Sequence, residues 1–351
     1  MMISTTNPTA MPSKPGVDPK ILALLPSLEE ILEVKNLPGS RWARISRIRV
    51  RNHDGNEENY FIKVSLGHHG REAIKGEFNA TSAIYAATPD FCPHPIAWGS
   101  LQTERDAHFY ICKYYHLSDA MPEPTLLSEK LAWLHSSHTS PNGKFGFYCA
   151  TYNGDIPQDN TWCDTWEAFF ANGLRQVLSV REERAGTDAT LDSLLPALFN
   201  KVIPRLLRPL ETNGRRIKPS LVHGDLWFGN CAVKHGSKEV IVFDPASFYG
   251  HNEYELGNWR PRRNRFKDGG YFEAYHSRMS PSEPVEDYDD RNALYALKFD
   301  LHAATMFPNK AEFLQMAIDD IRRLTTKYSD GYTGDEYTRT VGNDTDTSFQ
   351  K

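Results

Sequence analysis

The order of apolar and polar residues predicts two antiparallel strands near the start of the chain. Residues 42–50 and 60–65 alternate between the two classes, and the segment His-Asp-Gly-Asn at 53–56 separates them. A period of two is typical of a half-buried strand, and Asp-Gly is a strong hairpin signal. Ahead of this hairpin, the apolar residues of 18–35 recur at helical spacing, which predicts one or two short helices broken at Pro26.

The rest of the chain has mostly helical periodicity. A further strand is expected at 108–113. Amphipathic spacing predicts helices over 71–87 and 126–138, from near Trp162, over 190–212 with an interruption near Pro204, and over 292–307 and 310–328. The predicted architecture is therefore a small antiparallel sheet followed by a larger, mostly helical region.

Polar residues punctuate the segment 221–250. Asp225 and Asn230 lie five positions apart in a polar loop. The segment 240–243, Val-Ile-Val-Phe, then has the composition of a strand, and Asp244 follows it directly. This pattern predicts a loop followed by a β-hairpin, with a carboxylate at the exit of the second strand.

This order of residues suits phosphoryl transfer. The reaction needs a group that accepts the proton of an attacking hydroxyl and oxygen ligands that hold Mg²⁺ against nucleotide phosphates. Kinase catalytic loops place an Asp and an Asn five positions apart, and a metal-binding Asp after the next hairpin. Asp225 is therefore the candidate base, and Asn230 and Asp244 are the candidate Mg²⁺ ligands. The alternative is a turn in which these side chains only satisfy backbone groups.

The wording of the same segment is more specific than that of kinases in general. The runs His-Gly-Asp-Leu-Trp-Phe-Gly-Asn at 223–230 and Asp-Pro-Ala-Ser-Phe-Tyr-Gly-His at 244–251 closely resemble the fructosamine/ketosamine-3-kinase family, within the aminoglycoside/choline phosphotransferase-like kinases. The resemblance implies an α/β (α+β), two-lobed, protein-kinase-like fold with ATP between a small antiparallel-sheet N-lobe and a larger, mostly helical C-lobe. We expect His223 to brace the catalytic loop.

Two charged residues before the loop fit the same scheme. Lys63 lies inside the second predicted strand, where kinases carry the lysine that pairs with nucleotide phosphates. Glu72 and Glu77 of the following helix are candidate partners, and the resemblance, through Gly76-Glu77, selects Glu77. The segment 37–41 offers only one glycine, so the cover over the phosphates is shorter or differently built than a glycine-rich loop.

The predicted boundaries follow from the order of these elements. Tyr114, Tyr115 and His116 follow the strand at 108–113 and are expected to form the hinge whose backbone takes the adenine edge. The expected parts are a disordered tail at 1–17, an N-lobe on the nucleotide-phosphate side at 18–116, a C-lobe with the catalytic and acceptor side at 117–330, and a disordered tail at 331–351.

Composition narrows the class of protein. The 351 residues are 40% hydrophobic with a formal net charge of −5, which favours a globular protein over a nucleic-acid or membrane-surface binder. No apolar run approaches the length of a membrane span, and the first residues lack the apolar core of a signal peptide. Five scattered cysteines form no Cys-x-x-Cys, which favours reduced thiols and a cytoplasmic location.

The acceptor side is less determined. Trp227, two residues after the candidate base, either stacks on a sugar ring or packs within the lobe. The basic run at 260–267 is interpreted as a solvated loop, with an acceptor-side patch for an anionic substrate as the alternative.

The resemblance implies an ATP- and Mg²⁺-dependent kinase that phosphorylates ribulosamine or fructosamine adducts on small molecules or glycated protein. We expect a monomer. Two alternatives remain. One is a small-molecule phosphotransferase for an aminoglycoside, choline-like or secondary-metabolite hydroxyl, which the basic run favours. The other is a non-catalytic nucleotide-binding protein, which the single glycine of 37–41 favours.

Overall fold

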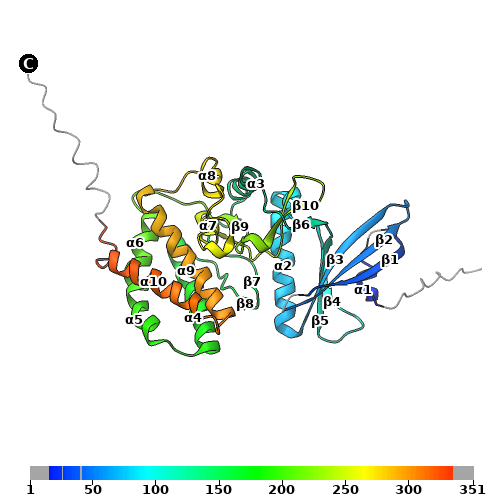
Figure 1. Cartoon of the computed structure of the whole chain (residues 1–351), viewed down its shortest axis with the longest axis horizontal. Coiled ribbons are helices and arrows are strands. Elements are labelled where there is room, and N and C mark those ends of the chain that lie inside the picture. Colours follow the sequence, from blue (N-terminus) through cyan, green and yellow to red (C-terminus); the bar gives the residue numbers. More distant parts are fainter. Residues whose placement is uncertain (1–15, 26, 40–41, 335–351) are drawn as a thin grey trace, which may run out of the picture. The chain divides into compact units, whose positions relative to one another are not determined.

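The chain divides into two compact units. The computed structural model describes residues 16–334 except residues 26, 40 and 41. The first unit comprises the chain up to Lys75 together with Pro95–Tyr114, and the second comprises Gly76–His94 and the chain from Tyr115 onwards. Figure 1 shows that the first unit is rich in strands and the second is mostly helical. The predicted tails fall almost entirely outside the described residues.

A five-stranded antiparallel sheet forms the first unit. Its spatial order is β1-β2-β3-β5-β4, with β1 (Leu28–Leu37), β2 (Arg44–Asn52), β3 (Glu57–Leu66), β4 (Pro95–Ser100) and β5 (Ala107–Lys113). The alternation along β2 and β3 buries one face, on which Ile48 packs near Ile62 in the core of this unit. Between the two strands, Asn52 Oδ1 accepts the amides of Asp54 and Asn56 at 3.1 and 2.9 Å. The predicted hairpin is confirmed.

The segment 18–35 is mostly a strand, so the prediction of helices there is wrong beyond the first turn. Only α1 (Pro19–Leu22) is helical, and β1 begins at Leu28. The pairing of β1 with β2 is irregular between Leu28 and Glu30 and again between Ile31 and Glu33. Each extra residue of a bulge changes the spacing of inward-facing side chains from two to three. The buried residues Leu28 and Ile31 therefore imitate helical periodicity.

Helices dominate the second unit. Their bounds are α2 (Gly67–Ala87, of which Gly76 onwards belongs here), α3 (Pro124–Ser137), α4 (Trp166–Ala185), α5 (Ala189–Ala197), α6 (Ile203–Leu207), α7 (Glu253–Gly257), α8 (Tyr271–His276), α9 (Tyr288–Met306) and α10 (Ala311–Lys327). The helices expected at 71–87, 126–138, 292–307 and 310–328 are confirmed within a few residues. The helix expected near Trp162 begins at Trp166, where Thr165 Oγ1 accepts the amide of Ala168 at 3.3 Å.

The predicted interruption in 190–212 is confirmed. A π-helical turn at Leu198–Val202 joins α5 to α6, and a 3₁₀ turn at Arg208–Glu211 ends the run. Pro204 lies in the first turn of α6, where proline is tolerated because the amide hydrogen that it lacks has no partner inside the helix.

Short antiparallel ribbons carry the segment 221–250. β9 (Ser220–Val222) pairs with β12 (Phe248–Gly250), and β10 (Cys231–Lys234) pairs with both β11 (Val240–Val242) and β6 (Leu117–Ser118). A two-stranded hairpin, β7 (Tyr152–Asn153) and β8 (Ile156–Pro157), stands apart from them in the sheet order. These ribbons place the loop 223–230 and the turn at Asp244 in one unit.

An aromatic cluster forms the centre of the second unit. Trp166 is fully buried, and its ring lies 5.7 Å from that of Phe169 and 6.4 Å from that of Phe248. Its indole Nε1 donates to Tyr295 Oη at 2.8 Å, which satisfies the polar atom of a buried tryptophan. The cluster thus joins α4, β12 and α9 in one core.

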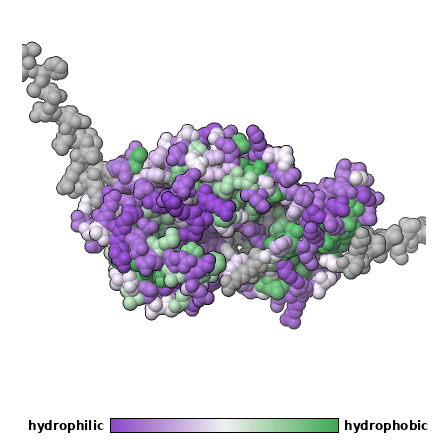
Figure 2. Space-filling view, in the orientation of Figure 1, coloured by the Kyte–Doolittle hydropathy of each residue, from purple (hydrophilic) through white to green (hydrophobic). Residues whose placement is uncertain are grey.

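The visible surface is largely hydrophilic. Figure 2 shows polar side chains over most of the exposed face of each unit, interspersed with smaller apolar areas. Within residues 16–334, as far as they are described, no helix combines the length and apolar character that crossing a membrane would require.

Candidate active site

Asn230 and Asp244 flank the same end of one hairpin. Cys231 pairs with Val242, and the amide of Phe243 donates to the carbonyl of Asn230 at 3.0 Å. Asp244 is exposed and has φ 53°, a left-handed conformation that is uncommon for residues other than glycine. Strained backbone of this kind clusters at functional sites. The strand pairing therefore brings the side-chain amide of Asn230 and the carboxylate of Asp244, whose backbone is strained, to the same end of the hairpin.

Two asparagine side chains hold Asp225. Asn230 Nδ2 donates to Asp225 Oδ2 at 3.1 Å and to its carbonyl at 2.9 Å, and Asn258 Nδ2 donates to Oδ1 at 3.3 Å. Burial raises the pKa of the Asp225 carboxyl to about 8, and the charges of Asp244 and Glu255 add to the increase. A carboxylate with a raised pKa is a stronger proton acceptor near neutral pH.

The ring of His223 adopts one neutral tautomer. Its Nε2 lies 3.0 Å from the carbonyl of Phe243, so this nitrogen carries the proton, and Nδ1 accepts the amide of Asp225 at 3.3 Å. Burial lowers the pKa of the His223 imidazole. The ring therefore links the loop that carries Asp225 to the strand that leads to Asp244.

Only glycine fits at position 224, between His223 and Asp225. Gly224 has φ +83°, and a Cβ atom there would stand 2.2 Å from the carbonyl oxygen of Ala246. The amide of Ala246 donates to the carbonyl of His223 at 2.9 Å. The loop and the segment after Asp244 therefore pack backbone against backbone, which only glycine permits.

A buried carboxylate from α7 clamps the loop backbone. Glu255 accepts the amide of His223 at 2.5 Å and that of Gly224 at 3.1 Å. Its side chain is fully buried, and His135 Nε2 lies 3.7 Å from Oε2. Hydrogen bonds from amides to a carboxylate are stronger than those between neutral groups. Glu255 thus fixes the backbone on which Asp225 is carried.

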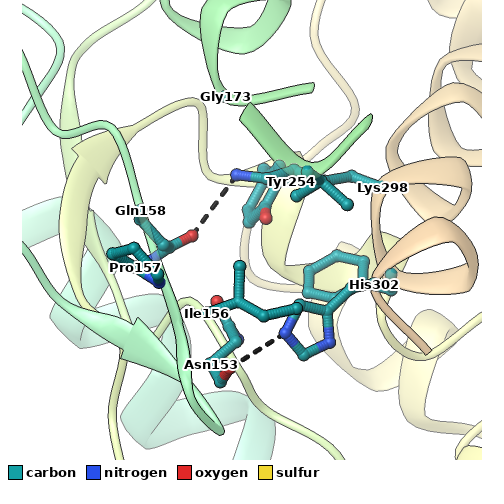
Figure 3. Close-up of a pocket in the computed structure, with 10 residues that line it drawn as sticks. Asn153, Ile156, Pro157, Gln158, Gly173, Tyr254, Lys298 and His302 are labelled. Carbon is teal, nitrogen blue, oxygen red and sulfur yellow. Dashed lines mark hydrogen bonds between the residues drawn. The ribbon is translucent and has the colours of Figure 1, made fainter. Parts of the chain in front are cut away.

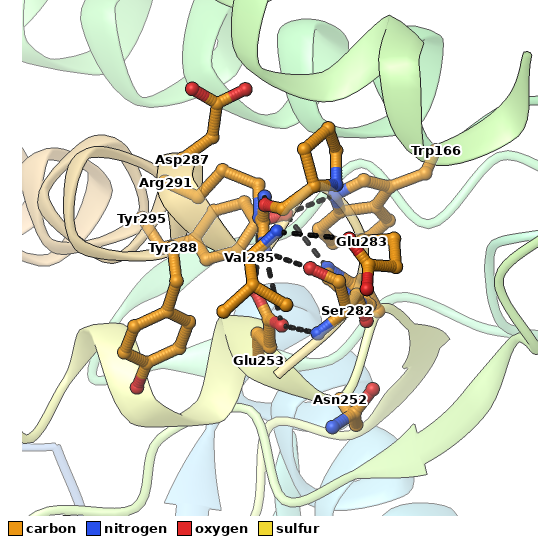
Figure 4. A network of polar contacts seen from close by, with 12 residues as sticks. Trp166, Asn252, Glu253, Ser282, Glu283, Val285, Asp287, Tyr288, Arg291 and Tyr295 are labelled. Atoms are coloured by element: carbon orange, nitrogen blue, oxygen red, sulfur yellow. Dashed lines mark hydrogen bonds and ion pairs between the residues drawn. The ribbon is translucent and has the colours of Figure 1, made fainter. Parts of the chain in front are cut away.

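A buried ion pair anchors α7 itself (Figure 4). Arg291 of α9 donates through Nε to Glu253 Oε2 at 3.0 Å and through Nη2 to Oε1 at 3.3 Å, and both side chains are almost fully buried. The amide of Ser282 donates to Glu253 Oε1 at 2.5 Å. Burial alone would raise the pKa of Glu253, but His251 and Arg291 hold this pKa below its ordinary value.

The hairpin β7–β8 adds a third asparagine to the loop. Asn153 Nδ2 donates to the carbonyl of Gly224 at 3.4 Å. His302 of α9 lies with Nε2 3.0 Å from the carbonyl of Asn153, a contact drawn in Figure 3. Burial lowers the pKa of His302 to about 4, so its ring is neutral at physiological pH. α9 therefore supports the hairpin that supports the loop.

A buried lysine lies in a small pocket behind this hairpin (Figure 3). Lys298 Nζ donates to Gln158 Oε1 at 3.3 Å and lies over the ring of Tyr254 at 5.2 Å. Burial lowers the pKa of the Lys298 ammonium to about 8. Gln158 Nε2 in turn donates to the carbonyl of Ala246 at 2.7 Å. The ammonium therefore fixes an amide that holds the backbone following Asp244.

Trp227 lies against its own loop. Its indole covers Gly229, where a Cβ would come within 2.6 Å of the ring, and it meets the Phe228 ring edge-on at 4.8 Å. The side chain is half-buried, so part of its surface faces solvent. Both roles expected of Trp227 are compatible with this placement.

The basic run 260–267 is not simply a solvated loop. Arg260 Nη1 pairs with Asp289 at 2.7 Å, and Arg263 Nη2 pairs with the buried Asp300 at 2.5 Å. The exposed Arg262 approaches Asp268 only at 4.0 Å. The interpretation as a fully solvated loop is therefore wrong for Arg260 and Arg263, which tie the run to α9.

The oxygen atoms at the hairpin end fit Mg²⁺. Asn230 Nδ2 donates to Asp225, so the amide oxygen Oδ1 of Asn230 is the atom of this side chain that could bind a metal. Asp244 supplies an exposed carboxylate. Mg²⁺ in phosphoryl-transfer sites is held by one or two such protein oxygens together with substrate phosphates and water. Within the described chain, no cluster of three or more His, Cys, Asp or Glu side chains stands ready to hold a metal alone.

The other predicted residues occupy defined positions. Lys63 lies in β3 opposite Ile45 and Tyr110, and Glu77 lies in α2. Glu72 pairs with Arg71 at 2.7 Å within the first unit.

The predicted hinge has no regular secondary structure. Tyr114 donates its amide to Asn59 at 2.9 Å, Tyr115 lies 5.1 Å beneath Lys234 Nζ, and the carbonyl of His116 accepts the amide of His235 at 2.7 Å. One of the boundaries between the two compact units falls between Tyr114 and Tyr115.

Sequence reasoning missed several residues that shape the site: Asn153, Gln158, Glu255, Asn258 and Lys298. Each acts through a contact between segments distant in sequence. No local pattern marks them, and even Glu255 lies in a segment that carries the further polar residues His251, Asn252 and Glu253.

Comparison with known proteins gives a consistent group of relatives. A family profile described as fructosamine kinase matches residues 29–326. A chloroplastic protein-ribulosamine 3-kinase of Oryza sativa subsp. japonica is 31% identical over 268 residues, which cover 76% of this chain and 73% of that protein. A ketosamine-3-kinase of Mus musculus is 30% identical over 274 residues, which cover 70% and 82%.

Solved structures agree on the fold. A putative fructosamine-3-kinase from Thermobifida fusca superimposes with a TM-score of 0.68 at 21% identity, over 89% of this chain and all of that one. A thermostable mutant of an aminoglycoside phosphotransferase, in ternary complex with AMP-PNP and hygromycin B, gives 0.55 at 16% identity, over 86% and 96%. The expected kinase-like α/β fold, with an antiparallel-sheet lobe and a mostly helical lobe, is thereby confirmed.

Proposed function

The chain belongs to the fructosamine kinase family, and on this premise we propose that it is an ATP-dependent kinase of ketosamines, the sugar adducts of small amines or of glycated proteins. The relatives named ribulosamine and ketosamine 3-kinases favour the third sugar carbon as the site of phosphorylation. One observation in the site carries the proposal: a half-buried, doubly hydrogen-bonded Asp225 stands on a backbone clamped by Glu255.

In the proposed reaction, Asp225 accepts the proton of the acceptor hydroxyl. The hydroxyl oxygen forms a bond to the γ-phosphorus, the bond from that phosphorus to the bridging oxygen breaks, and ADP leaves with the electron pair. Asn230 and Asn258 keep the carboxylate aimed, because both of its oxygens are held. Catalysis of this kind consists mainly of positioning and charge stabilisation.

Nucleotide binding is assigned to the predicted residues. Asn230 Oδ1 and Asp244 would hold Mg²⁺, which supplies charge neutralisation at the β- and γ-phosphates when bound. We assign Lys63 to the nucleotide phosphates and Tyr114, Tyr115 and His116 to the adenine edge. We also propose a cytoplasmic monomer, consistent with an odd number of cysteines and no Cys-x-x-Cys.

A screen of acceptors tests the function. ADP release is measured with purified enzyme, MgATP and ribulosamines, fructosamines, an aminoglycoside or choline in parallel. We expect turnover with a ketosamine and none with choline. Turnover of the aminoglycoside or choline alone, by an enzyme that binds ATP, would replace the ketosamine proposal with the small-molecule phosphotransferase.

Trp227 separates two roles for the acceptor side. If its exposed ring face stacks on the sugar, Trp227→Ala raises KM for the ketosamine by up to roughly tenfold, as expected for a lost stacking contact of about 0.5–1.5 kcal/mol, and leaves KM for ATP nearly unchanged. Steady-state kinetics and thermal unfolding are measured together. If both KM values and Tm change together, Trp227 only packs the loop.

A further inference from the structure

The charges of the run 260–267 are not equivalent. Arg260 and Arg263 are neutralised by Asp289 and Asp300, as described above. Arg265, in contrast, is exposed, and across the described part of the chain no carboxylate is paired with it. Arg265 and Lys267, which is likewise exposed with no carboxylate paired to it in the described chain, are therefore left for a partner outside the chain.

Arg265 is fixed against the catalytic loop. Its guanidinium carbon lies 4.2 Å from the centre of the Phe228 ring, and Phe228 lies between Asp225 and Asn230. A guanidinium over an aromatic ring keeps its N–H edge available for a bidentate contact with a carboxylate or phosphate. The stacking therefore orients an unpaired anion-binding group beside the loop.

The backbone at Arg265 has a strained, left-handed conformation. Its φ is 62° and ψ is 6°, a left-handed conformation in which a residue with a side chain is disfavoured. The residue before it, Asn264, donates to the carbonyl of Asn258 at 2.6 Å and to its Oδ1 at 2.8 Å. Asn258 holds Asp225, so two hydrogen-bonded steps connect the Arg265 backbone to the base.

We propose that Arg265 is a specificity residue that binds an anionic group, a carboxylate or a phosphate, on the acceptor. The inference rests on the proposed function and deepens it, because it names the substrate class as ketosamines that carry an oxyanion. Arg262 is also exposed, but no described aromatic ring fixes it and its neighbour is Asp268, which makes it a matched control. The buried Lys298 already bonds Gln158 inside its pocket.

Three acceptors separate the sources of the anion. The ribulosamine of propylamine carries no oxyanion, that of 3-aminopropanoate carries a carboxylate on the amine side, and the 5-phosphate of the first carries a phosphate on the sugar. For the wild-type enzyme we expect kcat/KM to be higher by roughly tenfold or more for at least one anionic acceptor, the usual contribution of a charge-assisted contact. The acceptor that shows the preference identifies the source.

Two variants test the assignment. Arg265→Gln should remove the preference through KM for the anionic acceptor, with KM for ATP unchanged, while Arg262→Gln should retain it. Arg265→Gly should lose the preference equally without lowering Tm, because glycine relieves the positive φ. If Arg265→Gln lowers Tm while Arg265→Gly keeps the preference for the anionic acceptor, the proposal is overturned.

Other outcomes also overturn it. An equal loss of preference in Arg262→Gln would mean that the overall positive charge of the run attracts the anionic acceptor, and not a specific contact with Arg265. A raised KM for ATP in Arg265→Gln would assign the residue to the nucleotide. If no ketosamine is turned over at all, the proposed function itself fails and the inference falls with it; if ketosamines are turned over without charge preference, only the inference fails.

Discussion

At the scale of single residues, the groups around Asp225 set both the position and the proton affinity of its carboxylate. Asn230 and Asn258 hold its two oxygens, while Asp244 and Glu255 contribute repulsion. The first pair fixes geometry and the second pair favours proton uptake. A base needs both properties, because transfer occurs only within hydrogen-bond reach and toward a group of matched pKa.

We predict that Asp225→Asn lowers kcat about 10²–10⁴-fold, the usual loss on removal of a positioned base. Replacing the carboxylate also removes repulsion with Asp244 and Glu255, so Tm should be unchanged or higher. Single-turnover kinetics and thermal unfolding are measured on the same preparation. A variant that keeps more than a tenth of the wild-type kcat would exclude Asp225 as the base.

The residues of the loop were predictable because their chemistry is local in sequence. Asp225, Asn230 and Asp244 appear within one short segment, at spacings that a hairpin fixes. Asn153 was not predictable, because it reaches the carbonyl of Gly224 from 71 residues earlier. Asn258 gave no signal either, since a single asparagine at the start of a basic run has no periodicity or spacing that marks it.

At the scale of elements, α7 is short and depends on its anchors. Its five residues cannot be stable alone, because isolated helices of this length are marginal. Glu253 and Arg291 hold it to α9, while Glu255 extends from it to the loop. The ion pair therefore supports the loop 223–230 from a distance.

Breaking this pair should be severe. Arg291→Met leaves Glu253 as a buried, unpaired charge, and we expect a loss of about 3–5 kcal/mol in the free energy of unfolding. The double variant Glu253→Gln with Arg291→Met keeps an acceptor for the amide of Ser282 and should recover part of this loss. Urea denaturation measures both, and a double variant no more stable than the single one would contradict the explanation.

The pairing of α9 with α10 should depend on pH. Asp290 is buried; burial alone would raise its pKa, but Arg323, Lys327 and Tyr328 lower it to about 2. Because the folded pKa is below the unfolded value of about 3.9, the contribution is complete above pH 5 and is lost as pH falls from 4 toward 2. Allowing for its exposed partners, its size is on the order of 1–2 kcal/mol.

Asp290→Asn tests this sign. The difference in unfolding free energy between wild type and variant should be constant from pH 5 to 7 and should shrink below pH 4. Denaturation with urea at each pH, at constant ionic strength, gives the difference. A gap that widens in acid would show that the carboxylate is not held ionised.

The element scale also shows where sequence patterns fail. The hairpin at β2 and β3 and the helices α3, α9 and α10 follow regular periods and were predicted. β1 was not, because its two register shifts replaced the period of two with one near three. A bulge depends on the partner strand, which periodicity in one segment cannot show.

At the scale of the whole molecule, the residues proposed for the nucleotide and for Mg²⁺ are tested together by one property, the binding of MgATP. We predict that MgATP raises Tm of the wild type more than ATP alone, since a ligand at 100 times its Kd adds about 2.7 kcal/mol. Asp244→Asn should lose the Mg²⁺-dependent part, while asparagine still tolerates the left-handed backbone. Calorimetric titration with and without Mg²⁺ checks the result, and an unchanged Mg²⁺ dependence would place the metal elsewhere.

The central position of Trp166 has an optical consequence. Its indole is shielded from water, bonded to Tyr295 and 6.2 Å from the ring of His251, whose pKa burial lowers to about 4. Emission from this residue should be blue-shifted in the folded second unit and move to longer wavelength when that unit opens. The second unit also contains Trp133, Trp162, Trp227 and the fully buried Trp259, so the difference in emission between wild type and Trp166→Phe isolates the signal of Trp166 and follows the unfolding of the second unit without any attached dye.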